Sequence, residues 1–298
     1  MPALPDVAWL LYMAERLRAG ARLYVDLVEV NPPLIVWLNV PAVTLAALLG
    51  CSPVLVYRCL VLATAVASCA LCARVLAEVK EPSDPDGRRV LLLLVAMAVA
   101  VLAGPDFGER EHLLLLLALP YVFLVAARLE ARPVGGGLAW LVGLAAGLGI
   151  ALKPYFVLLP LTLEAALLLG KPRRPVRPET LGIGIVIGTY LAAVQVWAGP
   201  YWRIASTLGK VYYEFLQEPV LVTAVAGHGA GLVLFALLAY GTLREPGRNP
   251  PLLRVLFLAT LAWYGSAVIQ RKGWRYHFYP AMSTAFLLLG LLALQARA

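Results

Sequence analysis

The sequence predicts an all-α, polytopic integral membrane bundle of about nine spans, with two juxtamembrane helices on its outer face. Apolar residues make up 61% of the 298 residues, and only 14% are charged. The mean hydropathy of +0.82 is far above that of a soluble domain. The apolar runs are rich in Leu and Ala and lack the two-residue alternation of a β-barrel. A helix is then the structure that satisfies the backbone polar groups in lipid.

The chain begins with a segment, 1–52, that we expect to lie along the outer surface. Residues 7–19 (VAWLLYMAERLRA) have the pattern of a short amphipathic helix. Asp6 is placed to cap its N-terminus, and Gly20 to end it.

A second surface helix is predicted over 33–50. This stretch is long enough to cross a bilayer, but it carries Asn39 and Pro41 in its middle. A helix that carries an asparagine and is broken by a proline suits an interfacial or re-entrant position better than a lipid-exposed span.

Residues 53–298 are predicted to form the transmembrane bundle, so that the whole chain, 1–298, is a single membrane domain. Its apolar runs have about the length of a bilayer core. The nine predicted spans are 54–78, 89–104, 112–128, 135–152, 154–170, 179–198, 220–243, 252–269 and 279–296.

Basic loops set the predicted topology. Short loops rich in Lys and Arg stay cytoplasmic, and with nine spans all such loops fall on the side of the C-terminus. The N-terminus is then outside. The basic positions are the loop 80–89, Arg128 and Arg132, the loop 171–179, and Arg244, Arg248 and Arg254. The net charge of +8 therefore reflects topology and anionic lipid or phosphate ligands, and we expect no nucleic-acid partner.

Carboxylates gather on the outer face. Asp26 and Glu29 precede the two prolines at 32–33, and Glu111 and His112 lie against a run of leucines. Ionisable groups are costly beside lipid, so a function for Glu111 and His112 is favoured over a solvated helix start.

Cations also occur on this face, where the topology rule predicts few. Lys153 lies in a short hairpin, where it either reaches up to the headgroups or binds a phosphate. The segment 269–280 is either an aromatic belt with basic anchors or a cationic site beside an aromatic surface. Its candidates are Arg271, Lys272, Arg275, Tyr276 and His277.

Carboxylates beside cations at a membrane surface suit one chemistry in particular. An ionised carboxylate takes a proton from an acceptor hydroxyl, while the cations stabilise a departing lipid phosphate. That is the transfer of a sugar from a polyprenyl phosphate.

The stretch PDVAWLLYMAERLRAGARLYVDLVEVNPPLIVWL resembles the first outer loop of the GT-C glycosyltransferases, a superfamily that includes protein O-mannosyltransferases and lipid A aminoarabinose transferases. Asp6 matches the family's opening Asp, the candidate base. Arg110, Glu111 and His112 lie where the family has a second acidic position, and Lys153 matches a lysine associated with the lipid phosphate. GWRYHFYPA matches the late outer motif. Relatives have one span before the opening Asp, which we expect to be missing here.

The resemblance implies an inverting glycosyltransferase in a bacterial-type inner (cytoplasmic) membrane, with its active site on the outer, periplasmic face. Its partners would be a polyprenyl-phosphate sugar donor, a lipid, glycan or protein acceptor, and membrane lipids. No cofactor is certain, because some relatives use a divalent metal (Mg²⁺ or Mn²⁺) and others do not. The catalytic candidates are Asp6, Asp26 and Glu29, and the substrate-binding candidates are Arg110, Glu111, His112, Lys153, Tyr155, Arg271, Lys272, Arg275, Tyr276 and His277.

Two other functions remain open at this point. One is a protein that binds or flips lipid-linked sugars, which requires polar residues along the membrane midplane. The other is a non-catalytic subunit of an envelope glycan assembly complex.

Overall fold

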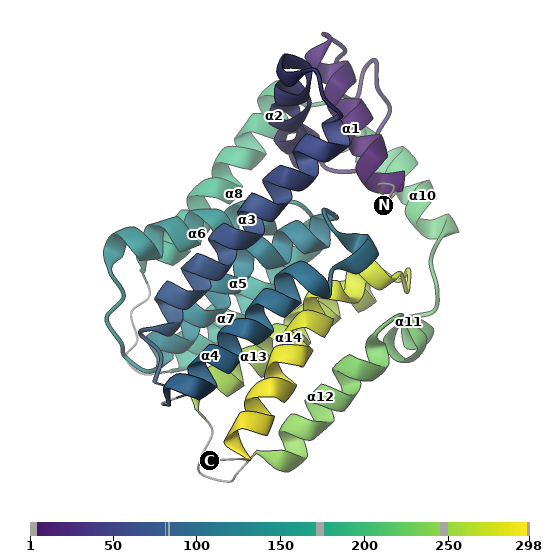
Figure 1. The fold of residues 1–298 in the computed structure, drawn as a ribbon. Coiled ribbons are helices and arrows are strands. Elements are labelled where there is room, and N and C mark those ends of the chain that lie inside the picture. Colours follow the sequence, from purple (N-terminus) through teal and green to yellow (C-terminus); the bar gives the residue numbers. More distant parts are fainter. Residues whose placement is uncertain (1–4, 81, 83, 171–175, 245–249, 297–298) are drawn as a thin grey trace.

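The computed structural model describes residues 5–80, 82, 84–170, 176–244 and 250–296, and this part of the chain is all-helical (Figure 1). The α-helices are α1 Pro5–Arg18, α2 Leu34–Leu49, α3 Pro53–Leu76, α4 Pro85–Ala96, α5 Arg110–Leu129, α6 Gly136–Ile150, α7 Leu158–Leu169, α8 Pro178–Trp197, α9 Tyr201–Ile204, α10 Lys210–Phe215, α11 Val220–Ala226, α12 Ala230–Leu243, α13 Pro251–Ile269 and α14 Arg275–Gln295. Shorter turns of other helix types are η1 Met97–Val101, η2 Gly104–Asp106, η3 Pro154–Val157 and η4 Ala205–Gly209.

Five of the described helices are long and apolar enough to cross a membrane: α3, α5, α8, α13 and α14. The pair α11–α12 adds a sixth if it is counted as one span bent by 76°. The chain is therefore a multi-pass membrane protein by length and composition. The other predicted spans are helical but shorter, so the count of nine stays a prediction.

The two N-terminal helices are present where they were predicted. α1 begins at Pro5, which places Asp6 inside the first turn rather than before it. Gly20 has a φ of +97°, the left-handed conformation in which a helix commonly ends. α1 and α2 pack against each other at one end of the bundle (Figure 1). Whether α2 lies in the interface stays a prediction.

The leucine run of α5 forms the centre of the bundle. In its most apolar window 83% of the residues are buried within the protein, against 17% for α8. α5 packs against α3, α6, α13 and α14. The start of α5, which carries the predicted site residues Arg110, Glu111 and His112, is therefore surrounded by other helices.

Glycines allow α6 and α8 to approach closely. A Cβ added at Gly143 would lie 2.4 Å from the backbone oxygen of Glu179, and one added at Gly182 would lie 3.0 Å from the backbone nitrogen of Leu144. Small residues of this kind let membrane helices pack through their backbones. This close contact, the α6–α8 seam, fixes the position of Glu179.

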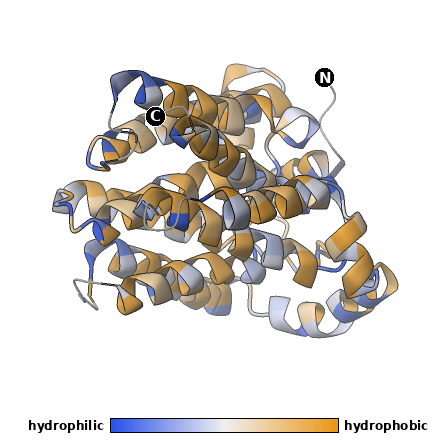
Figure 2. Cartoon of the chain, turned by 90° about the horizontal axis from the view of Figure 1, so that it is seen from below, coloured by the Kyte–Doolittle hydropathy of each residue, from blue (hydrophilic) through white to orange (hydrophobic). Residues whose placement is uncertain are grey.

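The described parts of two predicted basic regions, the one that begins at Lys80 and the one that contains Arg132, lie together at the end of the bundle away from α1. Lys80 N–H donates to Glu130, and the Arg132 guanidinium donates to the backbone oxygen of Glu78. Apolar residues dominate the helices between the two ends (Figure 2). Residues 81, 83, 171–175 and 245–249, with Arg248, lie outside the described residues. The assignment of this end to the cytosol stays a prediction.

Candidate functional site

A polar pocket of about 230 Å³ lies between the N-terminal segment and the bundle. It is formed by α1, the α1–α2 linker, the start of α5, the turn before η3, α10 and the α13–α14 turn. Its lining residues are Asp6, Trp9, Val28, Glu29, Val30, Asn31, Arg110, Lys153, Tyr212, Tyr213, Gln270, Lys272, Trp274, Tyr276 and His277.

Asp6 is the exposed carboxylate of this pocket. Its Oδ2 lies 3.5 Å from the Arg110 guanidinium and also 3.5 Å from the Tyr276 hydroxyl, which donates to it. The side chain of Asp6 keeps 46% of its surface accessible. Arg110 is buried and also donates to the side-chain oxygen of Asn31. Asp6 is thus oriented by two groups and remains open to a ligand.

Glu29 is buried and fully engaged. It accepts hydrogen bonds from Trp9 Nε1 at 2.6 Å, from the backbone N–H groups of Val30 and Asn31, and from the Asn31 side chain. Its oxygens are therefore directed at protein donors. Glu29 shapes the pocket wall by tying α1 to the linker, whereas Asp6 has the access that a base requires.

Lys153 reaches the pocket from the turn between α6 and η3. Its ammonium donates to Glu111 Oε1 at 2.5 Å and to Gln270 Oε1 at 3.2 Å, and His277 Nε2 lies 3.7 Å from the same Glu111 oxygen. Glu111 is completely buried behind the pocket wall. This network joins α5, α13 and α14 beneath the cavity.

Lys272 is the pocket's cation without a carboxylate partner among the residues that the structure describes. Its ammonium lies 4.0, 4.5 and 4.7 Å from the ring centroids of Tyr212, Tyr213 and Trp274. The tight α13–α14 turn presents it, with Arg271 and Gly273 on either side in the left-handed region. Aromatic faces attract an ammonium but leave its charge uncompensated.

The two lysines have lowered pKa values, chiefly because they are buried and in addition because other cations lie nearby. Burial, followed by the nearby Lys153 and Arg110 charges, lowers the pKa of Lys272 to about 8. Burial and then Arg110 lower the pKa of Lys153 to about 8, against the opposing effect of Glu111. Cations that depress one another's pKa favour the binding of an anion.

Glu109 is a buried group that the sequence did not single out for function. Neither of its carboxylate oxygens has a hydrogen-bond partner within the described part of the chain. Burial, and next the charges of Glu111 and Asp6, raise its pKa to about 8. Its position just before a leucine run is the signal in the sequence that pointed to burial.

Six predicted site residues lie outside the pocket lining, and one of them is Glu111, which is buried behind the pocket wall. Asp26 is exposed, and Arg22 binds it through a salt bridge of 3.1 Å, so it does not join Asp6 and Glu29. His112 accepts from Gly108 N–H and contacts the Val99 backbone oxygen, so both ring nitrogens are used within the protein. The others are Tyr155, Arg271, whose guanidinium donates to the Glu218 backbone oxygen, and Arg275, which pairs with Asp106 at 3.1 Å.

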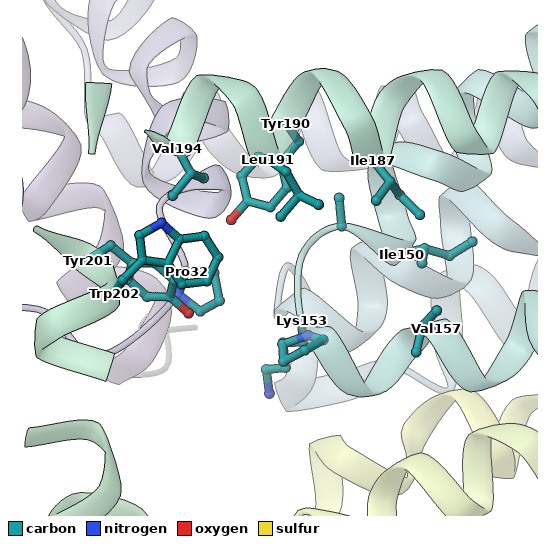
Figure 3. A pocket seen from close by; sticks show the side chains of 12 residues that line it. Pro32, Ile150, Lys153, Val157, Ile187, Tyr190, Leu191, Val194, Tyr201 and Trp202 are labelled. Atoms are coloured by element: carbon teal, nitrogen blue, oxygen red, sulfur yellow. The ribbon is translucent and has the colours of Figure 1, made fainter. Parts of the chain in front are cut away.

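An apolar groove of about 220 Å³ meets the polar pocket at Lys153. Pro32, Ile150, Val157, Ile187, Leu191 and Trp202 are among its lining residues (Figure 3). In Figure 3 the Lys153 side chain extends away from α8, while its backbone stays at the groove. The two cavities thus place an apolar surface beside a cluster of cations.

Gln270, Tyr212 and Tyr213 line the pocket but are not among the site residues predicted from the sequence. Gln270 ends an apolar helix, and its amide both accepts from Lys153 and donates to the Ser266 backbone oxygen. The tyrosines come from α10, in a long loop whose fold no local pattern predicts.

The side chains of the described residues are not arranged to coordinate a divalent metal. Within the described residues no group of three or more His, Cys, Asp or Glu side chains is arranged to hold an ion. Two residues of the predicted site that could coordinate a metal are also engaged elsewhere, His112 with the backbone and Glu111 with Lys153. The positive charge available to a substrate comes from Arg110, Lys153 and Lys272.

Comparisons with protein-family models, with curated proteins and with solved structures find no match to this chain.

Proposed function

We propose that this protein is a membrane glycosyltransferase that moves a sugar from a polyprenyl-phosphate donor to an acceptor at the outer face of a bacterial-type inner membrane. The observation that carries the proposal is the junction at Lys153 of an apolar groove with a pocket containing three cations and an accessible carboxylate. A lipid-linked sugar has the matching parts, an apolar chain, a phosphate and a polar sugar.

In this reaction the acceptor hydroxyl attacks the anomeric carbon from the side opposite the phosphate. Asp6 takes the hydroxyl proton as the new C–O bond forms. The bond between the anomeric carbon and the phosphate oxygen breaks, and its electron pair leaves with the phosphate. Arg110, Lys153 and Lys272 stabilise that developing charge. One displacement inverts the anomeric configuration.

The geometry favours Asp6 as the base over the other two carboxylates suggested by the sequence. Glu29 is bound by four donors, and Asp26 lies outside the pocket. Tyr276 and Arg110 hold Asp6 in place without covering it. Ionised carboxylates that remain accessible are the ones suited to proton abstraction.

The test is sugar transfer from a defined polyprenyl-phosphate sugar by the full chain reconstituted in liposomes. Asp6→Asn should lower kcat by about 10²- to 10⁴-fold. Asp26→Asn is the matched control, because it removes a carboxylate from the same segment without touching the pocket, and it should retain wild-type transfer. Equal activity of the two variants would remove Asp6 as the base.

One observation favours the alternative of a lipid-linked sugar flippase. The bent pair α11–α12 is a discontinuous helix of the kind that transporters use. The break, however, lies beside the α13–α14 turn, where His228 N–H donates to the Gly273 backbone oxygen. Headgroup movement across liposomes without sugar transfer would support this alternative over the enzyme.

A further inference from the structure

A second charged cavity, of about 260 Å³, lies at the end of the bundle away from the polar pocket. Among the residues that the structure describes, its lining includes three arginines, Arg128, Arg132 and Arg177, and no carboxylate. Leu167 and Val176 supply an apolar wall. We propose that this cavity, between the ends of α5 and α7 and the start of α8, binds a phosphate group.

The arginines at the base of the cavity are held in place from behind. Arg128 donates to both carboxylate oxygens of Glu179, at 2.9 and 3.0 Å. Arg177 is buried and pairs with Glu164. A guanidinium has five N–H donors, and the Glu179 carboxylate uses two of those of Arg128. The carboxylates thus orient the guanidinium groups without themselves lining the cavity.

Arg132 completes the site from the α5–α6 loop. Its Nε donates to the backbone oxygen of Glu78 at 3.0 Å, which fixes the side chain beside the cavity. Arg132 is exposed, whereas Arg177 is only 6% exposed. A ligand phosphate would therefore contact one arginine at the surface and two at the base.

Phosphate is the chemistry that this arrangement fits. Guanidinium groups bind phosphate oxygens through paired hydrogen bonds, and several of them share its charge. Basic cavities between membrane helices near the cytoplasmic surface bind phospholipid headgroups in this way. The exposed apolar side chain of Val176 provides a surface for the glycerol or acyl part. A free phosphate shares the same chemistry, so the two sources have to be distinguished by experiment.

This site is independent of the proposed sugar transfer. None of its residues lines the polar pocket or the apolar groove. Binding is therefore measurable whether or not the chain transfers a sugar.

Binding is tested with the full chain in a neutral detergent, by titration with phosphatidylglycerol, phosphatidylcholine or inorganic phosphate under native mass spectrometry. Phosphatidylglycerol should bind more tightly than phosphatidylcholine. Arg132→Gln should weaken its binding about fivefold, the effect of one arginine near a phosphate. Arg89→Gln is the matched control, because Arg89 is an exposed arginine of α4 outside the cavity, and it should bind as the wild type does.

The outcomes are decisive in both directions. An unaffected Arg132→Gln variant or the same loss in Arg89→Gln would overturn the proposal, and so would equal binding of the two lipids together with no Arg132-dependent binding of inorganic phosphate. Inorganic phosphate that binds with the same dependence on Arg132 identifies a soluble phosphate as the ligand. Binding restricted to phosphatidylglycerol identifies a lipid headgroup.

Discussion

The two ends of the bundle both bury arginines and glutamates, but they compensate these charges differently. At the end with the basic loops, Glu179 is bound through both oxygens by Arg128, and Glu164 accepts from Tyr121, Thr180 and Arg177. Glu164, which has no explanation in sequence, is thus a structural link between α5, α7 and α8.

The polar pocket is less completely compensated. The Lys272 ammonium lies against three aromatic rings and has no salt-bridge partner among the described residues. Glu109, next to the pocket residue Arg110, has two buried oxygens without a hydrogen-bond partner in that part of the chain. A buried ammonium without a carboxylate partner is costly, whereas Glu109, with a pKa of about 8, is mostly uncharged at neutral pH. The comparison therefore separates two carboxylates with several protein donors, Glu164 and Glu179, from Lys272, for which we propose a ligand as the partner.

The strongest test of this comparison is Arg128→Met. It leaves Glu179 buried without its main partner, and the free energy of unfolding should fall by about 3–5 kcal/mol. Arg128→Met combined with Glu179→Met should recover most of that loss, because an apolar pair replaces an ion pair at little cost. Denaturation in detergent measures both. A single variant as stable as the double one would contradict a structural role for this pair.

Arg110→Met tests the other end. Removing this cation should lower kcat/KM for sugar transfer by about 10²- to 10³-fold, the usual loss for one donor to a developing charge. Arg203→Met, which removes an exposed arginine of α9 outside the pocket, is the control and should keep wild-type transfer. Parallel losses in the two variants would indicate a general effect of surface charge.

Gly143→Ala tests whether the α6–α8 seam positions Glu179. The added methyl meets backbone atoms that cannot move aside, so unfolding should become easier by about 1–3 kcal/mol. Gly184→Ala, at a position with open space, is the matched control in the same pair of helices. Thermal unfolding of the two variants gives the difference, and an equal effect would mean that the close approach is unimportant.

The smallest expected effect is a pH dependence of donor binding. In the proposed reaction the donor phosphate binds the ammonium form of Lys272, so KM should rise about tenfold as the pH increases through 8. The stability of the folded protein should increase over the same pH range in which donor binding weakens. Unfolded Lys272 keeps its proton up to its normal pKa, so its contribution to the unfolding free energy increases with pH from about 8 upward.

Lys272→Arg provides the check on this assignment. Arginine stays charged over the whole range, so the dependence of KM on pH should flatten while binding persists. The measurement is sugar-transfer kinetics between about pH 7 and 9.5. An unchanged pH profile in this variant would assign the titration to another group, such as Lys153.

Much of the site was predictable from sequence, but individual carboxylates were not. Asp6, Arg110, Lys153 and Lys272 were predicted and line one pocket. Asp26 looks equally suitable in sequence, yet a local turn pairs it with Arg22, four residues earlier. Residues that are able to take part in chemistry can be found in the sequence by type and position. Whether a neighbour such as Arg22 forms a salt bridge with one of them depends on the local fold.

His112 and the leucine run of α5 show a second limit. A leucine run has the same hydropathy whether it faces lipid or the centre of a bundle, so its burial inside the protein was not predictable. The direction in which the His112 side chain points depends on how α5 packs against its neighbouring helices. Its ring faces the Val99 backbone and not the pocket, although the neighbouring Arg110 does line it.

The sequence by itself determined that the chain is helical and membrane-spanning, because long apolar runs leave lipid-embedded backbone no other way to hydrogen-bond. It also determined which residue types are available for chemistry near the ends of the helices. The tertiary structure alone decided that Asp6, Lys153 and Lys272, separated by up to 266 residues in numbering, share one cavity. Such convergence depends on how helices pack across long distances in the chain, and local periodicity carries no information about it.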